Sequence, residues 1–360
     1  MSTNIAYVDP DALIDYAAAI FEKSGLRAED AKVVGEDLVI ANLRGLDSHG
    51  VSRIPMYLER LRKGVVKAQP DITFEKKAGA VGLVDGGDGM GFLAAHRAMD
   101  EAITLADESG IGMVGVRRST HYGMGALYVL QAMRRGYISF AWTNSSPAIP
   151  VHGGRTTFLG AAPFAAGIPG GSEAPYVLDM AMTVIARGKI RLAAQHGLPI
   201  AEGLALDGDG APTTDAKKAF EGVCLPFGGV KGSALSMLMD LMCGALTGAN
   251  YGGQVKSLYF DHSEPQNVGH MMIAIRPNLF MPGDDFAARM DDFVQRAKAC
   301  PKAQNFDEIL MPGEPEERTT SKRSISGVPI TAHVLAELKH ESDQLGIRAI
   351  KASDMPFAAA

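Results

Sequence analysis

The period of the hydrophobic residues changes once along this chain, near Ile72, and this change constrains the fold more than any single motif. Before it, apolar residues recur at helical spacing in three segments, which begin after Asp9, near Glu29 and after Ser52. After it, short apolar runs bounded by glycine alternate with helical patterns, as in the strand 81–85, the helix 93–109 and the strand 110–116. This order predicts an α/β (α+β) protein in which a helical N-terminal region precedes a sheet.

The rest of the chain continues the alternation. The pattern predicts strands at 137–143, 176–180 and 269–276, helices at 182–194, 234–249, 284–299 and 331–345, a turn-rich stretch at 203–212 and a charged loop at 311–318. The helix at 234–249 is expected to be buried, because it is almost wholly apolar yet contains Asp240 and several glycines. We therefore expect a helical N-terminal domain at 1–75, joined by the C-terminal helix within 328–360. An α/β domain follows at 76–327, with an excursion near 195–225.

A histidine and an arginine stand in the stretch Gly45-Leu46-Asp47-Ser48-His49-Gly50-Val51-Ser52-Arg53, between two predicted helices. The glycines let the backbone turn sharply, Ser52 is a plausible N-cap, and Pro55 fits the first turn of the next helix. An imidazole exchanges a proton near neutral pH, and a guanidinium binds a carboxylate through two hydrogen bonds. The pair suits reduction of a carbonyl beside a carboxylate. The alternative is a polar loop whose His49 and Arg53 cap a helix or pair with Asp47.

The next helix carries Arg53, Tyr57 and Arg60 on one side, away from its apolar residues. Arg53 and Tyr57 can therefore point together into one site. The alternative is a solvated polar face.

A Gly-x-Gly-x-x-Ala pattern, formed by Gly89, Gly91 and Ala94, follows the strand 81–85 and resembles a Rossmann nucleotide fingerprint. That fingerprint requires an acidic residue after a second strand. Asp107 and Glu108 lie at about the required distance, but within the helix pattern and before the strand. The sequence therefore argues against a Rossmann fold.

Three further turns could bind an anion or a sugar. His121 lies among glycines between a strand and a helix start, where free amides favour phosphate or carboxylate. Asp179 ends a strand, where it could hold a ribose or cap the following helix. The stretch Gly228-Gly229-Val230-Lys231-Gly232 lacks Walker A spacing, but its lysine and helix start could cradle an anion. For each of these turns, ordinary capping or close packing is the alternative.

Charge and cysteine content exclude several function classes. The net charge of −6, with acids and bases interspersed, gives no support for nucleic-acid or anionic-membrane binding. Cys224, Cys243 and Cys300 are widely spaced, so we expect neither a disulfide framework nor a metal site. The N-terminal residues have neither a basic start nor an apolar core, so we expect no signal peptide. A cytoplasmic protein is expected.

Together these stretches resemble the type-2 malate/L-lactate dehydrogenase family of non-Rossmann, nicotinamide-dependent oxidoreductases. The resemblance covers nearly the whole chain, and its motifs occur in the family's order. They are Leu46-Asp47-Ser48-His49-Gly50 with Arg53, Thr120-His121-Tyr122-Gly123, Asp179-Met180-Ala181 with Arg187-Gly188-Lys189, Gly228-Gly229-Val230-Lys231-Gly232 and Pro312-Gly313-Glu314. It implies a helical N-terminal region packed on a large mixed-sheet domain. It also implies a homodimer with the site near the subunit interface.

The resemblance also implies roles for individual residues. His49 would be the proton donor in reduction, Ser48 its relay partner, and Arg53 the clamp for the substrate carboxylate, beside Tyr57. His121 would contact substrate and cofactor. NADH or NADPH would be held by the remaining positions, which are Tyr122, Gly123, Met124, Gly125, Asp179, Met180, Ala181, Arg187, Gly188, Gly229, Lys231, Pro312, Gly313 and Glu314.

Two departures from the family pattern bear on the substrate. Ala161-Ala162 replaces the Thr-Asn of the family's Gly-Thr-Asn-Pro, which removes a hydroxyl and an amide near the expected substrate. Lys189 stands at a catalytic position where imine-reducing members have an aspartate. Many hydroxyacid members have a lysine there, as this chain does. The expected activity is interconversion of a small 2-oxo acid and its 2-hydroxy acid. The alternatives are reduction of cyclic imino acids, such as piperideine- or pyrroline-2-carboxylate, and a catalytically silent ligand-binding member.

Overall fold

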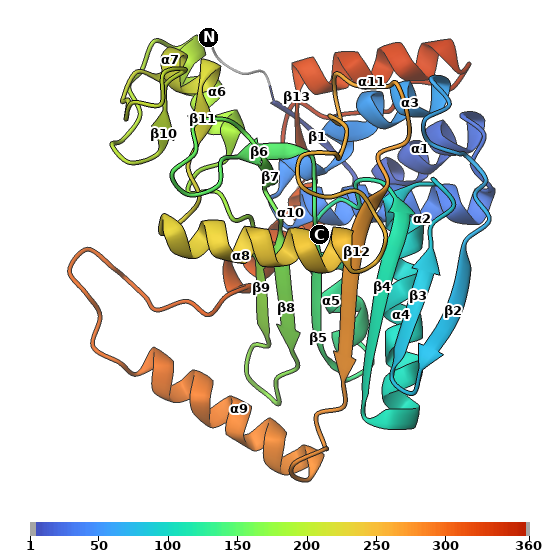
Figure 1. The fold of residues 1–360 in the computed structure, drawn as a ribbon. Helices are drawn as coiled ribbons and strands as arrows, with labels where there is room; N and C mark the ends of the chain where they lie inside the picture. Colours follow the sequence, from blue (N-terminus) through green and yellow to red (C-terminus); the bar gives the residue numbers. More distant parts are fainter. Residues whose placement is uncertain (1–4, 358–360) are drawn as a thin grey trace.

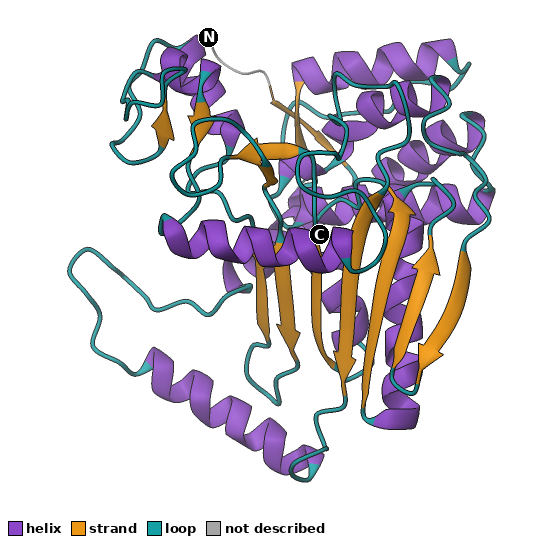
Figure 2. Ribbon diagram, viewed as in Figure 1, coloured by secondary structure: helices purple, strands orange, loops and turns teal. Residues whose placement is uncertain are grey.

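The computed structural model describes residues 5–357. A seven-stranded sheet forms its centre, with helices on both faces (Figures 1 and 2). In spatial order its strands are β2 (Thr73–Ala78), β3 (Val81–Asp85), β4 (Ile111–Ser119), β12 (Val268–Ile275), β5 (Ile138–Thr143), β8 (Phe164–Ile168) and β9 (Tyr176–Met180). Only β3 and β4 pair in parallel, and every other neighbouring pair is antiparallel. The sheet is therefore mixed, and it is not the parallel sheet of a Rossmann fold.

The predicted N-terminal helices are confirmed as α1 (Pro10–Lys23), α2 (Ala28–Leu43) and α3 (Ile54–Arg62). Asp9 caps α1 by accepting the amide of Ala12 at 2.9 Å. The C-terminal segment returns to these helices, because β13 (Val328–Thr331) pairs with β1 (Ile5–Val8) and α11 (Ala332–Gln344) contacts α3. One apolar cluster joins the N-terminal helices to α4 (Gly91–Ser109), α5 (Ala126–Met133) and the sheet. The boundary near residue 75 therefore stays a prediction.

The glycines of the Gly-x-Gly-x-x-Ala pattern are explained by packing within the chain. A Cβ atom at Gly91 would lie 2.2 Å from the carbonyl oxygen of Thr120, and one at Gly89 would lie 2.3 Å from Pro70. Gly91 also begins α4. These glycines allow the start of α4 to pack closely against Pro70 and Thr120 of the same chain. This role in packing fits the sequence argument against a Rossmann site.

The excursion has a small core of its own. It contains α6 (Arg187–Gln195), β10 (Ala205–Leu206), α7 (Ala216–Glu221) and β11 (Val223–Cys224). Its apolar cluster is formed by Ile190, Ala205, Ala219 and Cys224, separate from the main core. The predicted helix at 182–194 is wrong at its start. The helix begins only at Arg187. Residues 182–184 pair with distant backbone instead, because Met182 donates to the carbonyl of Ala161, Val184 donates to that of Leu225, and Thr183 forms a bridge with Pro226.

Two other predictions also need correction. The charged loop at 311–318 ends at Gly313, where α10 (Glu314–Ser326) begins. The buried helix at 234–249 is α8 (Val230–Asp240), which continues as a π-helical turn, Leu241–Ala245, and crosses one face of the sheet (Figure 1). Only one side of it is buried, and Leu238 and Leu241 on the other side are half exposed. No helix within residues 5–357 is both long and apolar enough to cross a membrane.

Helix α9 (Gly283–Lys298) lies apart from the other helices, below the sheet in Figure 1. The connection between β8 and β9 contacts it directly. The carboxylate of Asp291 accepts the amides of Gly171, Ser172 and Glu173 from that connection, at 3.1, 2.8 and 2.9 Å. These hydrogen bonds, that of the Ser172 amide first, lower the pKa of Asp291 to about 2. One carboxylate thus ties α9 to the sheet.

Replacing Asp291 tests this attachment. Asp291→Ala removes the acceptor shared by three amides, so hydrogen exchange at residues 171–173 should rise about tenfold or more while the core helices exchange as before. Hydrogen exchange with mass spectrometry measures it. Asp292→Ala is the control, because among residues 5–357 the Asp292 carboxylate pairs only with Arg296 of the same helix, at 3.5 Å. Equal exchange in the two variants would contradict the attachment.

Candidate active site

The loop that carries His49 is held by a buried asparagine of α2. It consists of two short 3₁₀ turns, Asp47–His49 and Val51–Arg53. The side chain of Asn42 accepts the amide of Val51 at 2.9 Å and donates to Asp47 at 2.7 Å. A Cβ atom at Gly50 would lie 2.0 Å from the Asn42 side-chain oxygen. Gly50 is therefore required by this close approach, whereas Gly45, with φ of +85°, supplies the sharp turn.

Two sequence expectations for this loop are wrong. Ser52 does not cap α3, because its hydroxyl donates to the carbonyl of Asp47 at 2.7 Å and the helix begins at Ile54 without a side-chain cap. Asp47 does not pair with His49 or Arg53. Its carboxylate pairs with Arg323 of α10 at 2.7 and 3.1 Å. The C-terminal part of the chain thus fixes the loop, and His49 and Arg53 stay free of Asp47.

His49, Tyr57 and His121 come together from separate segments. The rings of His49 and His121 are stacked with centroids 5.9 Å apart and an angle of 23°. The hydroxyl of Tyr57 lies 2.7 Å from Nδ1 of His121. Ser48 lies beside His49, with its hydroxyl 3.0 Å from Nδ1. These four predicted residues therefore lie together in one cluster, and their roles stay a prediction.

The contacts of His121 assign its tautomer. The amide of Gly123 donates to Nδ1 of His121 at 3.3 Å, and an amide nitrogen cannot accept in return. Nδ1 must then be unprotonated, so the Tyr57 hydroxyl donates to it as well. The proton of the neutral ring is assigned to Nε2. His121 is thereby left with one N–H donor for a ligand.

Arg53 has no acidic partner among residues 5–357. Its Nε donates to the carbonyl of Ser48 at 2.5 Å, and its guanidinium carbon lies 5.4 Å from the ring centroid of Tyr259. The two Nη groups have no hydrogen-bond partner in this part of the chain. A partly buried guanidinium without an anion is unfavourable by itself, and its free edge matches the geometry of a carboxylate.

Electrostatics keeps both imidazoles neutral. Burial lowers the pKa of His49 to about 4, with the positive charge of Arg53 acting in the same direction. Burial also lowers the pKa of His121 well below its ordinary value, followed by the charges of His49 and Arg53. Burial lowers the pKa of Arg53, and Arg191 adds to this while Tyr57 opposes it. At neutral pH the cluster therefore presents neutral imidazoles beside a cation, which favours an anionic ligand.

The segment after His121 is packed into the core. The Tyr122 ring is buried and stacks on His270 of β12, with centroids 4.7 Å apart. Met124 is buried as well, and a Cβ at Gly125 would lie 2.9 Å from that of Ala165. Only the backbone of this segment is placed to line a cofactor site. The side chain of Tyr122, which we expected there, faces the core.

Asp179 and Pro312-Gly313 lie at one cavity of about 350 Å³. Asp179 accepts the amide of Ala126 at 2.8 Å, so it caps α5 and not the helix that follows it in sequence. Burial raises the pKa of Asp179 to about 6, although this amide opposes the shift. Arg44 also lines the cavity. Glu314 is engaged elsewhere, because its carboxylate pairs with Lys298 and accepts the amide of Met311.

The remaining predicted residues are exposed or lie at the rim. Arg187 donates to the carbonyl of Phe220 at 3.1 Å, and its guanidinium carbon lies over the Phe220 ring. The side chains of Lys189 and Lys231 have no hydrogen bond or ion pair among the described residues, although both backbone amides donate to nearby carbonyls. The remaining members are Met180 and Ala181, which end or follow β9, Gly188 in α6, and Gly229, which immediately precedes α8. The structure therefore does not bring Lys189 into contact with the His49 cluster.

Ala162 retains the backbone geometry that an asparagine would favour. It is buried and has a positive φ of 40°, a region in which asparagine is much commoner than alanine. Its neighbour Ala161 donates its amide to the hydroxyl of Ser145 at 3.1 Å. The departure from the family pattern thus removes side-chain groups and keeps the turn.

Sequence reasoning missed the residues that support the site. Asn42 and Arg323 hold the His49 loop, and Tyr259 contacts Arg53. None of them belongs to a motif, and Arg323 and Tyr259 are far from the loop in sequence. Within residues 5–357 no cluster of three His, Cys, Asp or Glu side chains is close enough to hold a metal ion.

Comparison with known proteins agrees with this geometry. The family described as malate/L-lactate dehydrogenase matches residues 8–339. The chain belongs to this family. The resemblance on which the sequence analysis relied is therefore confirmed, as is the mixed-sheet fold that it implied.

The relatives act on different substrates. The malate/(S)-sulfolactate dehydrogenase of Methanothermus fervidus is 34% identical over 94% of this chain and 98% of its own. The solved sulfolactate dehydrogenase of Methanocaldococcus jannaschii has a TM-score of 0.91 at 36% identity, over 95% of this chain and 98% of that one. The solved delta1-piperideine-2-carboxylate reductase of Pseudomonas syringae has a TM-score of 0.83 at 29% identity, over 93% and 99%. Other relatives are dehydrogenases named for NAD(+) or NADP(+).

The low pKa of His49 predicts a pH-dependent stability. Between about pH 6.5 and 4 the unfolded chain binds a proton at this residue and the native chain does not, so the free energy of unfolding falls as the pH is lowered. His49→Gln should reduce that fall by about 2 kcal/mol, as measured by urea unfolding at pH 7 and 4.5. His333→Gln, at an exposed histidine, is the control. An unchanged pH dependence in His49→Gln would contradict the burial of a neutral ring.

Proposed function

We propose that this chain is an NAD(P)-dependent oxidoreductase that interconverts a small 2-oxo acid and its 2-hydroxy acid. The observation that carries the proposal is the guanidinium of Arg53, free of any described carboxylate, beside the neutral rings of His49 and His121. If the carboxylate of a 2-oxo acid binds Arg53, the 2-oxo group next to it would lie near the two imidazoles. Membership in a family of hydroxyacid dehydrogenases supports hydride transfer at that carbonyl carbon.

The residues divide the chemistry. The Nη groups of Arg53 bind and orient the substrate carboxylate, so that the reacting carbonyl is held in a fixed position relative to the catalytic groups. The Nε2–H of His121 donates to the carbonyl oxygen, where negative charge develops during reduction. His49 supplies the proton to that oxygen and takes it back in oxidation, with Ser48 at its other nitrogen. The nicotinamide, when bound, supplies or accepts the hydride.

Substrate binding prepares His49 for this role. In the free protein burial and the charge of Arg53 keep its pKa at about 4, too low for a proton donor near neutral pH. A carboxylate on Arg53 compensates that charge, so the proton affinity of His49 rises when the substrate binds. The carboxylate thus both anchors the substrate and favours the protonated acid.

The dinucleotide is proposed to lie along the backbone of residues 121–125 and the cavity at Asp179 and Pro312-Gly313. The cavity of about 350 Å³ supports this placement. Met180, Ala181, Arg187, Gly188, Gly229 and Lys231 are proposed to line the rest of the cofactor's path, and Lys189 remains a proposed catalytic position. Both NAD and NADP are kept as candidate cofactors.

Two substitutions test the roles of His49 and Arg53. His49→Ala should lower kcat by about 10² to 10⁴ and leave cofactor binding unchanged, because only the proton transfer is lost. Arg53→Ala should raise KM for 2-oxo acids about tenfold or more, through loss of a charged hydrogen-bond pair. Arg296→Ala, at an exposed arginine of α9, is the control. Rates like wild type in both variants would refute the proposed site.

A substrate panel separates the alternatives. We expect oxidation of NADH or NADPH with 2-oxo acids, and little with piperideine- or pyrroline-2-carboxylate, because Lys189 stands where imine-reducing members have an aspartate. Cyclic imino acids remain the second candidate substrates, because the solved delta1-piperideine-2-carboxylate reductase has a similar fold. Preference for the cyclic imines would reverse the assignment. Turnover of any 2-oxo acid would exclude a silent ligand-binding member, the third candidate, suggested by Ala161-Ala162.

We further propose that the protein works in the cytoplasm. Its three cysteines are free thiols, which fits a reducing compartment.

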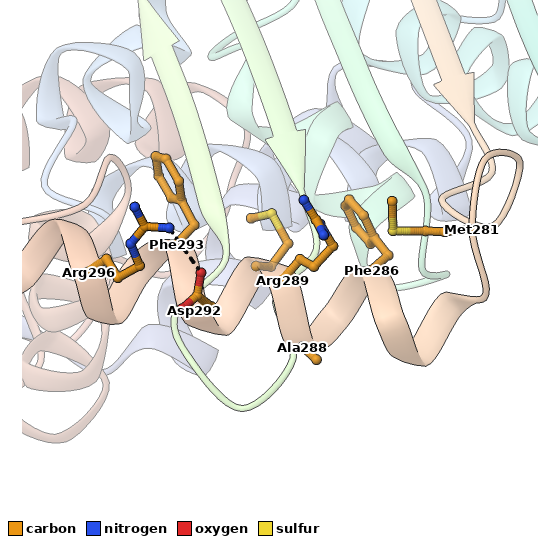
Figure 3. Close-up of a pocket in the computed structure, with 8 residues that line it drawn as sticks. Met281, Phe286, Ala288, Arg289, Asp292, Phe293 and Arg296 are labelled. Carbon is orange, nitrogen blue, oxygen red and sulfur yellow. Dashed lines mark hydrogen bonds and ion pairs between the residues drawn. The ribbon is translucent and has the colours of Figure 1, made fainter.

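We also propose that the protein is a homodimer. The exposed side of α8 and the adjoining turn presents Leu235, Leu238 and Leu241. Figure 3 shows a second uncovered apolar region, a cavity of about 690 Å³ into which Phe286 and Phe293 point from α9. Apolar surfaces of this kind are typical of subunit contacts.

The dimer proposal predicts that charge on α8 separates the subunits. Leu238→Asp with Leu241→Asp should convert the dimer to a monomer, because each leucine loses about 1.5–3 kcal/mol of burial on association. Light scattering after size exclusion measures the mass. Leu198→Asp, at an exposed leucine of the excursion, is the control. A monomeric wild type, or an unchanged double variant, would contradict this interface.

A further inference from the structure

Helix α3 carries a second arginine whose contacts lead back to the site. Arg60 is 1% exposed, and it has no carboxylate partner among residues 5–357. Its Nη1 donates to the carbonyls of Ser257, Leu258 and Asp261 at 3.3, 3.4 and 3.4 Å. Its Nε and Nη2 have no hydrogen-bond partner. A buried cation satisfied only by three carbonyls of one short segment fixes the position of that segment.

The segment held by Arg60 contains Tyr259, which contacts Arg53. The three carbonyls lie on both sides of Tyr259 in sequence, and its ring centroid lies 5.4 Å from the guanidinium carbon of Arg53. Arg53 and Arg60 stand on one side of α3, seven residues apart. Arg60 of α3 therefore tethers the segment, and the segment supports Arg53, the residue that immediately precedes the same helix.

The contacts of Arg53 show what this support does. Its Nε donates to the carbonyl of Ser48, and its guanidinium carbon lies over the Tyr259 ring. These two contacts restrain the guanidinium, and its Nη groups are left without a hydrogen-bond partner among residues 5–357. The Nη edge is the one that forms two parallel hydrogen bonds with a carboxylate.

We propose that Tyr259 is a positioning residue for the substrate carboxylate, and that Arg60 acts through it by holding residues 257–261. The inference rests on the proposed role of Arg53. Core packing does not explain Tyr259, because it is 48% exposed and its neighbour Phe260 is 90% exposed. The segment is held by Arg60, by the pairing of Lys256 with Glu264 at 3.0 Å and by the buried side chain of Leu258, whereas Tyr259 itself is left half exposed.

The first test removes the ring. Tyr259→Leu should raise KM for the 2-oxo acid about three- to tenfold, with kcat and the Kd of the reduced cofactor close to wild type. Tyr259→Phe should restore the wild-type KM, because the aromatic face is retained. Tyr251→Leu is the matched control, since Tyr251 is exposed to a similar extent (44%) and contacts no described cation. Steady-state kinetics and cofactor fluorescence titration measure both quantities.

The second test asks whether Arg60 and Tyr259 act as one unit. Arg60→Lys, which keeps the charge but loses the planar fork, should raise KM as Tyr259→Leu does, and the double variant should be no worse than either single one. Additive effects on KM, or an unchanged KM in Tyr259→Leu while Arg53→Ala raises it, would overturn the inference and leave the proposed function intact. An unchanged KM in Arg53→Ala would instead refute the proposed function itself.

Discussion

A positive charge without a described counter-ion governs this site. Arg53 is partly buried, bound at Nε to a backbone carbonyl and at one face to Tyr259, and it contacts no carboxylate among residues 5–357. Its charge helps to keep His49 and His121 neutral, although burial contributes more. The cost of holding such a group is offset when an anion binds. The substrate carboxylate therefore completes the electrostatics of the folded protein and also changes the acidity of the catalytic group.

Much of the fold could be predicted from local patterns, and the errors have physical causes. Asp9 and Pro10 fixed the start of the first helix, and the glycine-bounded apolar runs gave the central strands. Residues 182–184 were misassigned because their backbone pairs with Ala161 and Leu225, which are distant in sequence. The start of α10 was missed although Pro315 and three glutamates mark a helix N-terminus. The backbone pairing of residues 182–184 could not be predicted from local sequence, because its partners are distant. The start of α10 could have been predicted from Pro315 and the glutamates.

The centre of the candidate site was predictable, whereas its supports were not. His49, Arg53, Tyr57 and His121 could be proposed because each lies beside a helix start or on a helix face, and the structure gathers them. The cofactor residues were assigned by resemblance, and the side chains of Arg187, Lys189 and Lys231 make no hydrogen bond or ion pair with the His49 cluster among the described residues. Tyr259 and Arg323 reach the loop from other parts of the sequence. Such contacts have no local signature, since only the fold creates them.

The contact between Asn42 and Gly50 has an evolutionary consequence. With 2.0 Å available for a Cβ atom, no larger residue can replace the glycine unless the asparagine first becomes smaller. The shortened residue would release the amide of Val51 and the carboxylate of Asp47, so each single step passes through a weakened intermediate. The two positions should therefore change together across related sequences or not at all, and their covariation records a steric lock beneath the loop.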